Sequence, residues 1–239
     1  LLHTLDETTF SGDAEITTNG GRQHYGSTTI FNSDATFADP TDAVRRLDPA
    51  AGEWVDGPRL PLPRAAAAAA YDGTRVVYGG GVGPAGLTGE VLALEGGQWR
   101  RLGDLSVPRE HLAAASDGAG RVWFVGGRTA GLDTNLAAVD LVRADDVRAA
   151  GDLPTPRGGV AAFHAPAVGA CLVGGEQPDG TLAAVECIAA DGTLTRLPDL
   201  AVPRHGLAAA VVDGVAHVLA GGPQPGLTVS AAVETLRVR

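Results

Sequence analysis

The sequence predicts an all-β fold, a β-propeller, on the basis of three regularities. A Pro-Arg turn followed by an alanine-rich apolar run occurs four times, with prolines at Pro63, Pro108, Pro156 and Pro203, spaced 45, 48 and 47 residues apart. In each unit a second apolar run then ends on Gly-Gly, and two further short runs follow before the next Pro-Arg. A fixed period of about 47 residues indicates a repeat architecture. Four short strands per repeat are typical of a propeller blade.

The first two runs of each unit are predicted to form a hairpin. In residues 202–222 they are joined by Asp213-Gly214, and Asp-Gly between apolar runs is a strong hairpin signal. Residues 65–70, all alanine, would be helical by propensity alone. The aligned runs of the other units place them on strand one instead, where blades crowd the axis and small side chains fit.

The second half of each unit supplies strands three and four. Strand four opens on Trp54, Trp99, Val147 or Leu194, in each case nine residues before the next Pro-Arg proline. Strand three opens on an Ala-Val pair in four units and on Glu-Val in the remaining one; these pairs lie at 43–44, 90–91, 138–139, 184–185 and 232–233.

Five Gly-Gly pairs predict five blades in a single domain. The pairs lie at 20–21, 80–81, 126–127, 174–175 and 221–222. The predicted blades cover approximately residues 1–60, 61–105, 106–153, 154–200 and 201–239. One four-stranded blade cannot bury both of its faces alone, so neighbouring blades must pack face to face around an axis.

The last predicted blade lacks its outer strand within this chain, because only six residues follow Val233. We expect the missing strand to come from outside residues 1–239. A segment upstream of Leu1 is the expected source, and a neighbouring protein is the alternative. Such a strand would leave no open sheet edge.

The repeat resembles the kelch family in three features: the Gly-Gly that closes strand two, the tryptophan that opens strand four, and the Pro-Arg before strand one. The resemblance covers nearly all 239 residues, although two units lack the tryptophan. It implies a propeller that presents one loop-rich face to a partner. Kelch-like repeats also occur in galactose oxidase, but three tyrosines and two strand cysteines give no match to its copper site.

Charge, apolar stretches and cysteine positions limit the kinds of partner and the cellular compartments that fit this sequence. The net charge of −10 argues against nucleic acid, which requires clustered basic groups. No apolar stretch is long enough to span a membrane. Pairing outward from the loop after Gly175 places Cys171 opposite Cys187, so a disulfide is the favoured prediction over two buried thiols. A disulfide would indicate an extracytoplasmic site: periplasmic, cell-surface or secreted.

Candidate binding residues lie where the Gly-Gly loops and the Pro-Arg turns emerge on one face. The nine candidates are Arg22, His24, Tyr25, Phe31, Glu110, His111, Arg128, Glu176 and His205. The 22–41 connection is the longest and carries three aromatic residues, so we expect it to be ordered and to carry the partner contact. The arginines of the Pro-Arg turns recur in every unit and are expected to serve blade packing.

Three functions stay open at this point. The favoured one is a non-catalytic binding or scaffold propeller for a protein or glycan partner. The second is a carbohydrate-active enzyme of the sialic acid mutarotase kind, in which Glu110, His111 and His205 would transfer protons. The third is a structural subunit of a larger assembly. No catalytic motif, cofactor motif or metal-ligand spacing of the six histidines is found in the sequence.

Overall fold

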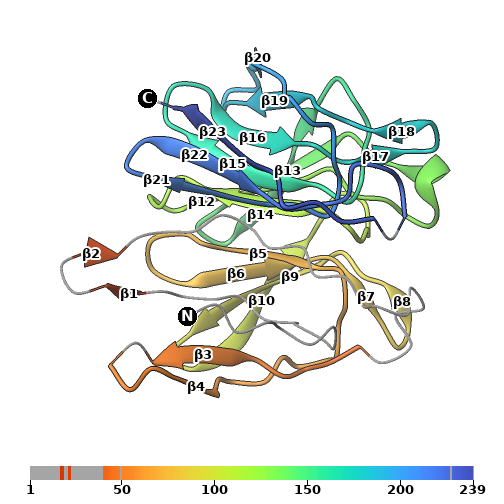
Figure 1. The fold of residues 1–239 in the computed structure, drawn as a ribbon. Helices are drawn as coiled ribbons and strands as arrows, with labels where there is room; N and C mark the ends of the chain where they lie inside the picture. Colours follow the sequence, from red (N-terminus) through yellow and green to blue (C-terminus); the bar gives the residue numbers. More distant parts are fainter. Residues whose placement is uncertain (1–16, 19–20, 23–39, 49, 227, 239) are drawn as a thin grey trace.

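The chain forms a β-propeller in the computed structural model, which describes residues 17–18, 21–22, 40–48, 50–226 and 228–238 (Figure 1). Three complete four-stranded antiparallel sheets form its second, third and fourth blades. The second blade consists of β5 (Ala68–Tyr71), β6 (Val76–Gly79), β9 (Glu90–Glu95) and β10 (Gln98–Asp104). The third blade consists of β11 (Ala113–Ser116), β12 (Arg121–Val125), β13 (Ala138–Arg143) and β14 (Asp146–Asp152). The fourth blade consists of β15 (Ala161–Ala165), β16 (Gly169–Val173), β19 (Val185–Ile188) and β20 (Leu194–Leu197).

The remaining sheets are smaller. The last blade has three strands among the described residues, β21 (Ala208–Val212), β22 (Val215–Leu219) and β23 (Val233–Arg237), and within those residues it has no outer strand, as predicted. The first sheet pairs β3 (Arg45–Asp48) with β4 (Glu53–Asp56).

Short elements complete the described chain. Three two-stranded ribbons pair β1 (Thr17–Thr18) with β2 (Gly21–Arg22), β7 (Val82–Gly83) with β8 (Gly86–Leu87), and β17 (Glu176–Gln177) with β18 (Gly180–Thr181). The single helical turn in the described ranges is η1 (Leu132–Thr134), a 3-10 helix. Within these ranges no helix has the length and apolar character needed to cross a membrane.

The alanine run around residues 65–70 belongs to the innermost strand and not to a helix. Strand β5 begins later than the sequence suggested, because Ala66 adopts a positive φ of 53°. Ala65 instead makes an isolated bridge to Val82. The small side chains let β5 pack closely beside β11, and Ala68 is almost completely buried.

Apolar seams between successive blades form the core. The second, third and fourth blades each pack their forward face on the rear face of the next blade. The forward face of the third blade consists of Ala113, Ala115, Trp123, Val125, Val139 and Leu141. It packs on the rear face of the fourth blade, formed by Val160, Ala162, Ala170, Leu172 and Ile188. The second and third blades, and the fourth and last blades, are joined in the same manner.

Two backbone hydrogen bonds reinforce each of these three seams near the axis. At the seam of the third and fourth blades, Gly127 N donates to Arg157 O at 2.9 Å, and Gly159 N donates to His111 O at 3.1 Å. A Cβ on Gly126 would lie only 2.8 Å from Arg157 O, so the Gly-Gly pair is required by this close approach and by its positive φ angles.

The glycine turn of the last blade lies one residue earlier than predicted, at residues 220–221 instead of 221–222. Leu219 pairs with Val233 as Val125 pairs with Val139, so Ala220 and Gly221 occupy the positions of Gly126 and Gly127. Ala220 adopts the same left-handed φ, 55°, that glycine adopts in the complete blades. Gly222 therefore corresponds to Arg128.

The arginines of the Pro-Arg turns are structural, as expected. Arg109, Arg157 and Arg204 are completely buried, and each pairs with a carboxylate of strand three in its own blade. These partners, Asp140, Glu186 and Glu234, follow the strand-three valine directly. In the second blade Leu92 takes that position, and Arg64 pairs with Glu90 and lies over the ring of Tyr78.

Cys171 and Cys187 form the predicted disulfide. They lie directly opposite each other on β16 and β19, in the register that pairing outward from the loop after Gly175 predicts. Both side chains are completely buried in the forward face of the fourth blade. The disulfide therefore lies in the apolar seam between the fourth and last blades.

Candidate functional site

Each of the four Pro-Arg turns brings two residues together at the inner end of its blade. The residue after the arginine makes an isolated bridge to the residue that follows the glycine turn. The pairs are Ala65 with Val82, Glu110 with Arg128, Gly158 with Glu176, and His205 with Gly222. The backbone is the same in every blade, so the chemistry of this axial ring depends on the side chains alone. The second blade contributes small apolar groups, and the next three contribute charged or polar ones.

Five polar side chains of three blades converge into one network, called here the axial network: Glu110, His111, Arg128, Glu176 and His205. Arg128 bridges its two carboxylates, with Nε 3.4 Å from Glu110 Oε1 and Nη1 3.1 Å from Glu176 Oε1. His111 Nδ1 lies 3.1 Å from Glu110 Oε1. His205 Nδ1 lies 3.5 Å from Glu176 Oε2, and its Nε2 is 3.0 Å from the carbonyl oxygen of Gln224.

Burial and neighbouring groups shift the pKa values of two members of this network, His111 and Glu110. Burial strongly disfavours the charged form of His111 and lowers its pKa, although the nearby Glu110 opposes this effect. Burial would raise the pKa of Glu110, but the contact with His111 and the charge of Arg128 outweigh it and lower that pKa. At neutral pH Glu110 is therefore ionised, while His111 is uncharged.

The backbone of His111 adopts a conformation that glycine normally takes. Its φ is 52°, and the equivalent residues are Ala66, Gly159 and Gly206. A side chain at such a position costs roughly 1–2 kcal/mol. The inter-blade bonds from His111 N to Ala66 O and from Gly159 N to His111 O hold the residue there. Backbone strain of this kind is concentrated at functional sites.

Asn135 belongs to the same site, and sequence reasoning missed it. Its Nδ2 donates to Glu176 O at 2.7 Å, which directs Oδ1 the other way, towards Gly158. Oδ1 is buried and has no hydrogen-bond partner in the described part of the chain. Nothing in the sequence separates Asn135 from the other polar residues of its loop, because its position depends on the neighbouring blade.

The structure thus brings together the five candidates in the axial network. Arg22 lies on β2, opposite Thr17. His24, Tyr25 and Phe31 lie outside the described residues, and so does most of the 22–41 connection. The network by itself offers carboxylate acceptors, guanidinium donors and the neutral imidazole of His111, and groups of these kinds can orient a small polar ligand.

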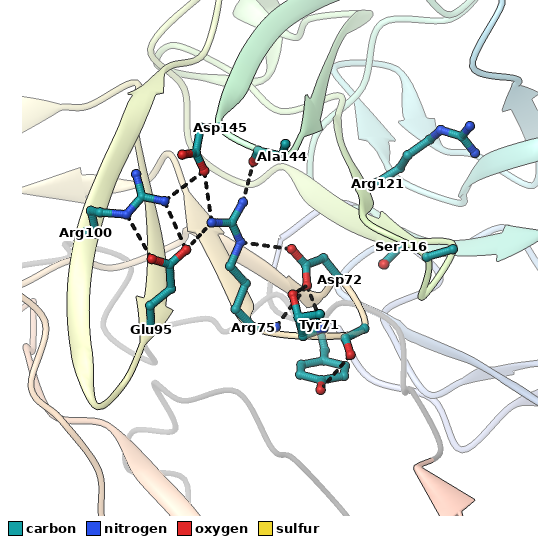
Figure 2. Close-up of polar contacts among 12 residues, drawn as sticks. Tyr71, Asp72, Arg75, Glu95, Arg100, Ser116, Arg121, Ala144 and Asp145 are labelled. Atoms are coloured by element: carbon teal, nitrogen blue, oxygen red, sulfur yellow. Dashed lines mark hydrogen bonds and ion pairs between the residues drawn. The ribbon is translucent and has the colours of Figure 1, made fainter.

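A second polar cluster lies at the opposite ends of the strands, where the hairpin turns of the second and third blades meet (Figure 2). Arg75 is its centre. Its Nε donates to Asp72 Oδ2 at 3.0 Å, its Nη1 bonds to Glu95 and Asp145, and its Nη2 donates to the carbonyl oxygen of Ala144.

Arg100 completes this cluster. It donates two hydrogen bonds to Glu95, at 2.9 and 3.0 Å, and one to Asp145 at 2.8 Å. These bonds and those of Arg75 lower the pKa of Glu95 to about 2. The cluster borders an open hollow of about 710 Å³. Because the carboxylates of Figure 2 are each bonded to an arginine, we interpret this cluster as a clasp between the two blades.

Within the described ranges, no three His, Cys, Asp or Glu side chains are placed to hold a metal ion together. The axial network contains enough carboxylate and imidazole groups for such a site, but the guanidinium of Arg128 occupies the position between its two carboxylates.

Comparisons with known proteins support the fold. No family model matches the sequence. No curated protein matches it either. The fold is similar to the solved structure of YjhT, with a TM-score of 0.70 and 13% sequence identity, over 94% of this chain and 84% of YjhT. At this identity the likeness shows the propeller fold alone, and the kelch resemblance of the repeats stays a prediction.

Proposed function

We propose that this protein is a glycan-binding propeller whose ligand contacts the axial network. The observation that carries the proposal is the convergence of Glu110, His111, Arg128, Glu176 and His205 at one end of the axis, around a strained histidine. Sugar hydroxyl groups both donate and accept hydrogen bonds, so their recognition needs fixed groups of both kinds. A network held in place by three blades supplies them with little loss of side-chain freedom on binding.

The compartment fits this role. A buried disulfide is stable in oxidising surroundings, so we place the protein outside the cytoplasm, where glycans of cell surfaces and secretions are accessible. A protein partner on the same face is the competing form of the binding proposal.

A glycan array followed by calorimetry tests the proposal. Arg128→Gln should weaken binding of any glycan identified on the array by about tenfold or more, because a charge-assisted hydrogen bond contributes about 1.5–3 kcal/mol. Arg121→Gln is the matched control, since Arg121 belongs to the same blade but pairs with Asp117 at the opposite end. Equal loss of affinity in the two variants, or an array without any bound glycan, would contradict the proposal.

One observation favours catalysis as a second candidate. Glu110 and His111 lie side by side, and at neutral pH Glu110 is ionised and His111 is uncharged, so each has a site that can accept a proton from a sugar hydroxyl group. Exchange spectroscopy of the α and β anomers of a bound sugar separates the two functions. Glycan binding alone leaves the exchange rate unchanged. Acceleration that Glu110→Gln abolishes would establish a mutarotase-like activity instead.

A further inference from the structure

The last blade has a forward face at the same backbone positions as the blades before it. By register with the third blade, this face consists of Ala208, Ala210, His217, Leu219, Val233 and Thr235. Its rear face packs on the fourth blade through Leu207, Ala209, Ala216 and Val218. The two faces together show that the last blade is built to lie between two neighbours.

Among the described residues, the forward face of the last blade is only partly covered, in contrast to the forward faces of the second, third and fourth blades. The strand-three valine is completely or almost completely buried in the second, third and fourth blades, as Val91, Val139 and Val185. Its equivalent Val233 is 61% exposed, and Leu219 beside it is 38% exposed. Exposed valine and leucine side chains on adjacent strands are costly unless another surface covers them.

The last blade also carries the backbone donor and acceptor that form the two seam hydrogen bonds in the other blades. At the three complete seams, the second residue of the glycine turn donates to the next blade, and the residue at the His111 position accepts from it. On the last blade these groups are Gly221 N–H and Gly206 C=O. Neither has a hydrogen-bond partner among the residues that the structure describes.

The β3–β4 sheet also carries an exposed side chain at a position that is packed in the next blade. Trp99 of the second blade packs against Tyr78 and donates from Nε1 to Pro58 O, in the loop after the preceding outer strand. Trp54 is the equivalent residue of the β3–β4 sheet and is 51% exposed. Figure 1 shows the β3–β4 sheet well apart from the β21–β23 sheet, so these two surfaces do not cover each other.

We propose that the forward face of the last blade is a docking surface for one further blade of the same repeat. The three existing seams define the partner face: a β-sheet that carries the equivalents of Val160, Ala162, Ala170, Leu172 and Ile188. Its Pro-Arg carbonyl accepts from Gly221 N, and its turn N–H donates to Gly206 O. The interface is a continuation of the three seams that already hold the ring together, and it is independent of the glycan proposal.

An extended chain tests this surface. A second copy of residues 146–200 is added after Arg239, where it continues the repeat in phase because Arg237 occupies the position of Arg143. Val233→Cys supplies the reporter thiol, since both native cysteines are in the disulfide. The added blade should slow labelling at residue 233 by about tenfold or more, because labelling then requires opening of the seam. Val229→Cys, at a 90% exposed position, is the control and should label equally fast in both chains.

One further measurement, made on the original chain, keeps the proposal open to refutation if the extended chain misfolds. In the original chain the Gly221 amide should exchange its hydrogen about 100-fold faster or more than those of Gly127 and Gly175. Equal protection of the three amides would overturn the proposal, as would unchanged labelling at residue 233 in a folded extended chain. Protection that rises with protein concentration would show that a second copy covers the face instead. Leu172→Asp in the added copy should restore fast labelling.

Discussion

Breaking one buried arginine–carboxylate pair should destabilise the whole propeller. Arg109 and Asp140 are both completely buried, with Arg109 Nη1 2.7 Å from Asp140 Oδ2. Asp140 also accepts hydrogen bonds from the N–H and the hydroxyl group of Ser106. Asp140→Asn keeps the shape of the side chain but leaves the guanidinium charge of Arg109 uncompensated in the core. Burial already disfavours that charge and lowers the pKa of Arg109, and Asp140 is what opposes this effect.

The expected cost follows from this geometry. Removing one partner of a buried pair costs about 3–5 kcal/mol. At about 2–4 °C per kcal/mol for a domain of this size, Tm should fall by about 10 °C. Thermal unfolding followed by circular dichroism measures the change. Asp199→Asn is the matched control, because Asp199 pairs with Arg196 on the exposed surface and should leave Tm nearly unchanged.

A double variant distinguishes the buried charge from other causes. Replacing both partners with apolar residues, Arg109→Met together with Asp140→Leu, leaves no charge in the seam and should recover most of the lost stability. The reasoning would be refuted if Asp140→Asn lowered Tm no more than Asp199→Asn. It would be refuted as well if the double variant were less stable than Asp140→Asn by itself.

Three further predictions concern protonation and the disulfide. Because the pKa of His111 is lowered in the folded protein, only the unfolded chain protonates this histidine just below pH 6.5. The free energy of unfolding should therefore fall as the pH drops from 7 to 5. Urea unfolding measures this fall, which should be smaller in His111→Gln. NMR titration should find the pKa of Glu95 near 2, returning towards 4.5 in Arg100→Gln; a normal value in the native protein would disprove the clasp. Native mass spectrometry with alkylation should find no free thiol, and reduction should cost about 3 kcal/mol for a loop closed across 16 residues; two labelled cysteines before reduction would contradict the disulfide.

The sequence by itself determined the repeat, and it determined the strands and their pairing in the second, third and fourth blades. These features are local: a hairpin turn and the alternation of a strand set the register between neighbours, and so place Cys171 opposite Cys187. The recurrence of Pro-Arg in four of the five units likewise separated structural arginines from candidate ligands. Repetition carried this information, since a residue that blades need for packing recurs from unit to unit.

The tertiary structure alone decided how the blades meet. The contact of Arg128 with Glu176, and that of Asn135 with the carbonyl of Glu176, cross from one blade to the next and leave no spacing signal in the chain. The strain at His111 is visible only in its backbone, where φ is 52°. The exposure of Val233 could not be read from its sequence context, which matches that of the buried Val139 and Val185. Burial depends on which surface lies opposite a side chain, and in a propeller that surface belongs to the neighbouring blade.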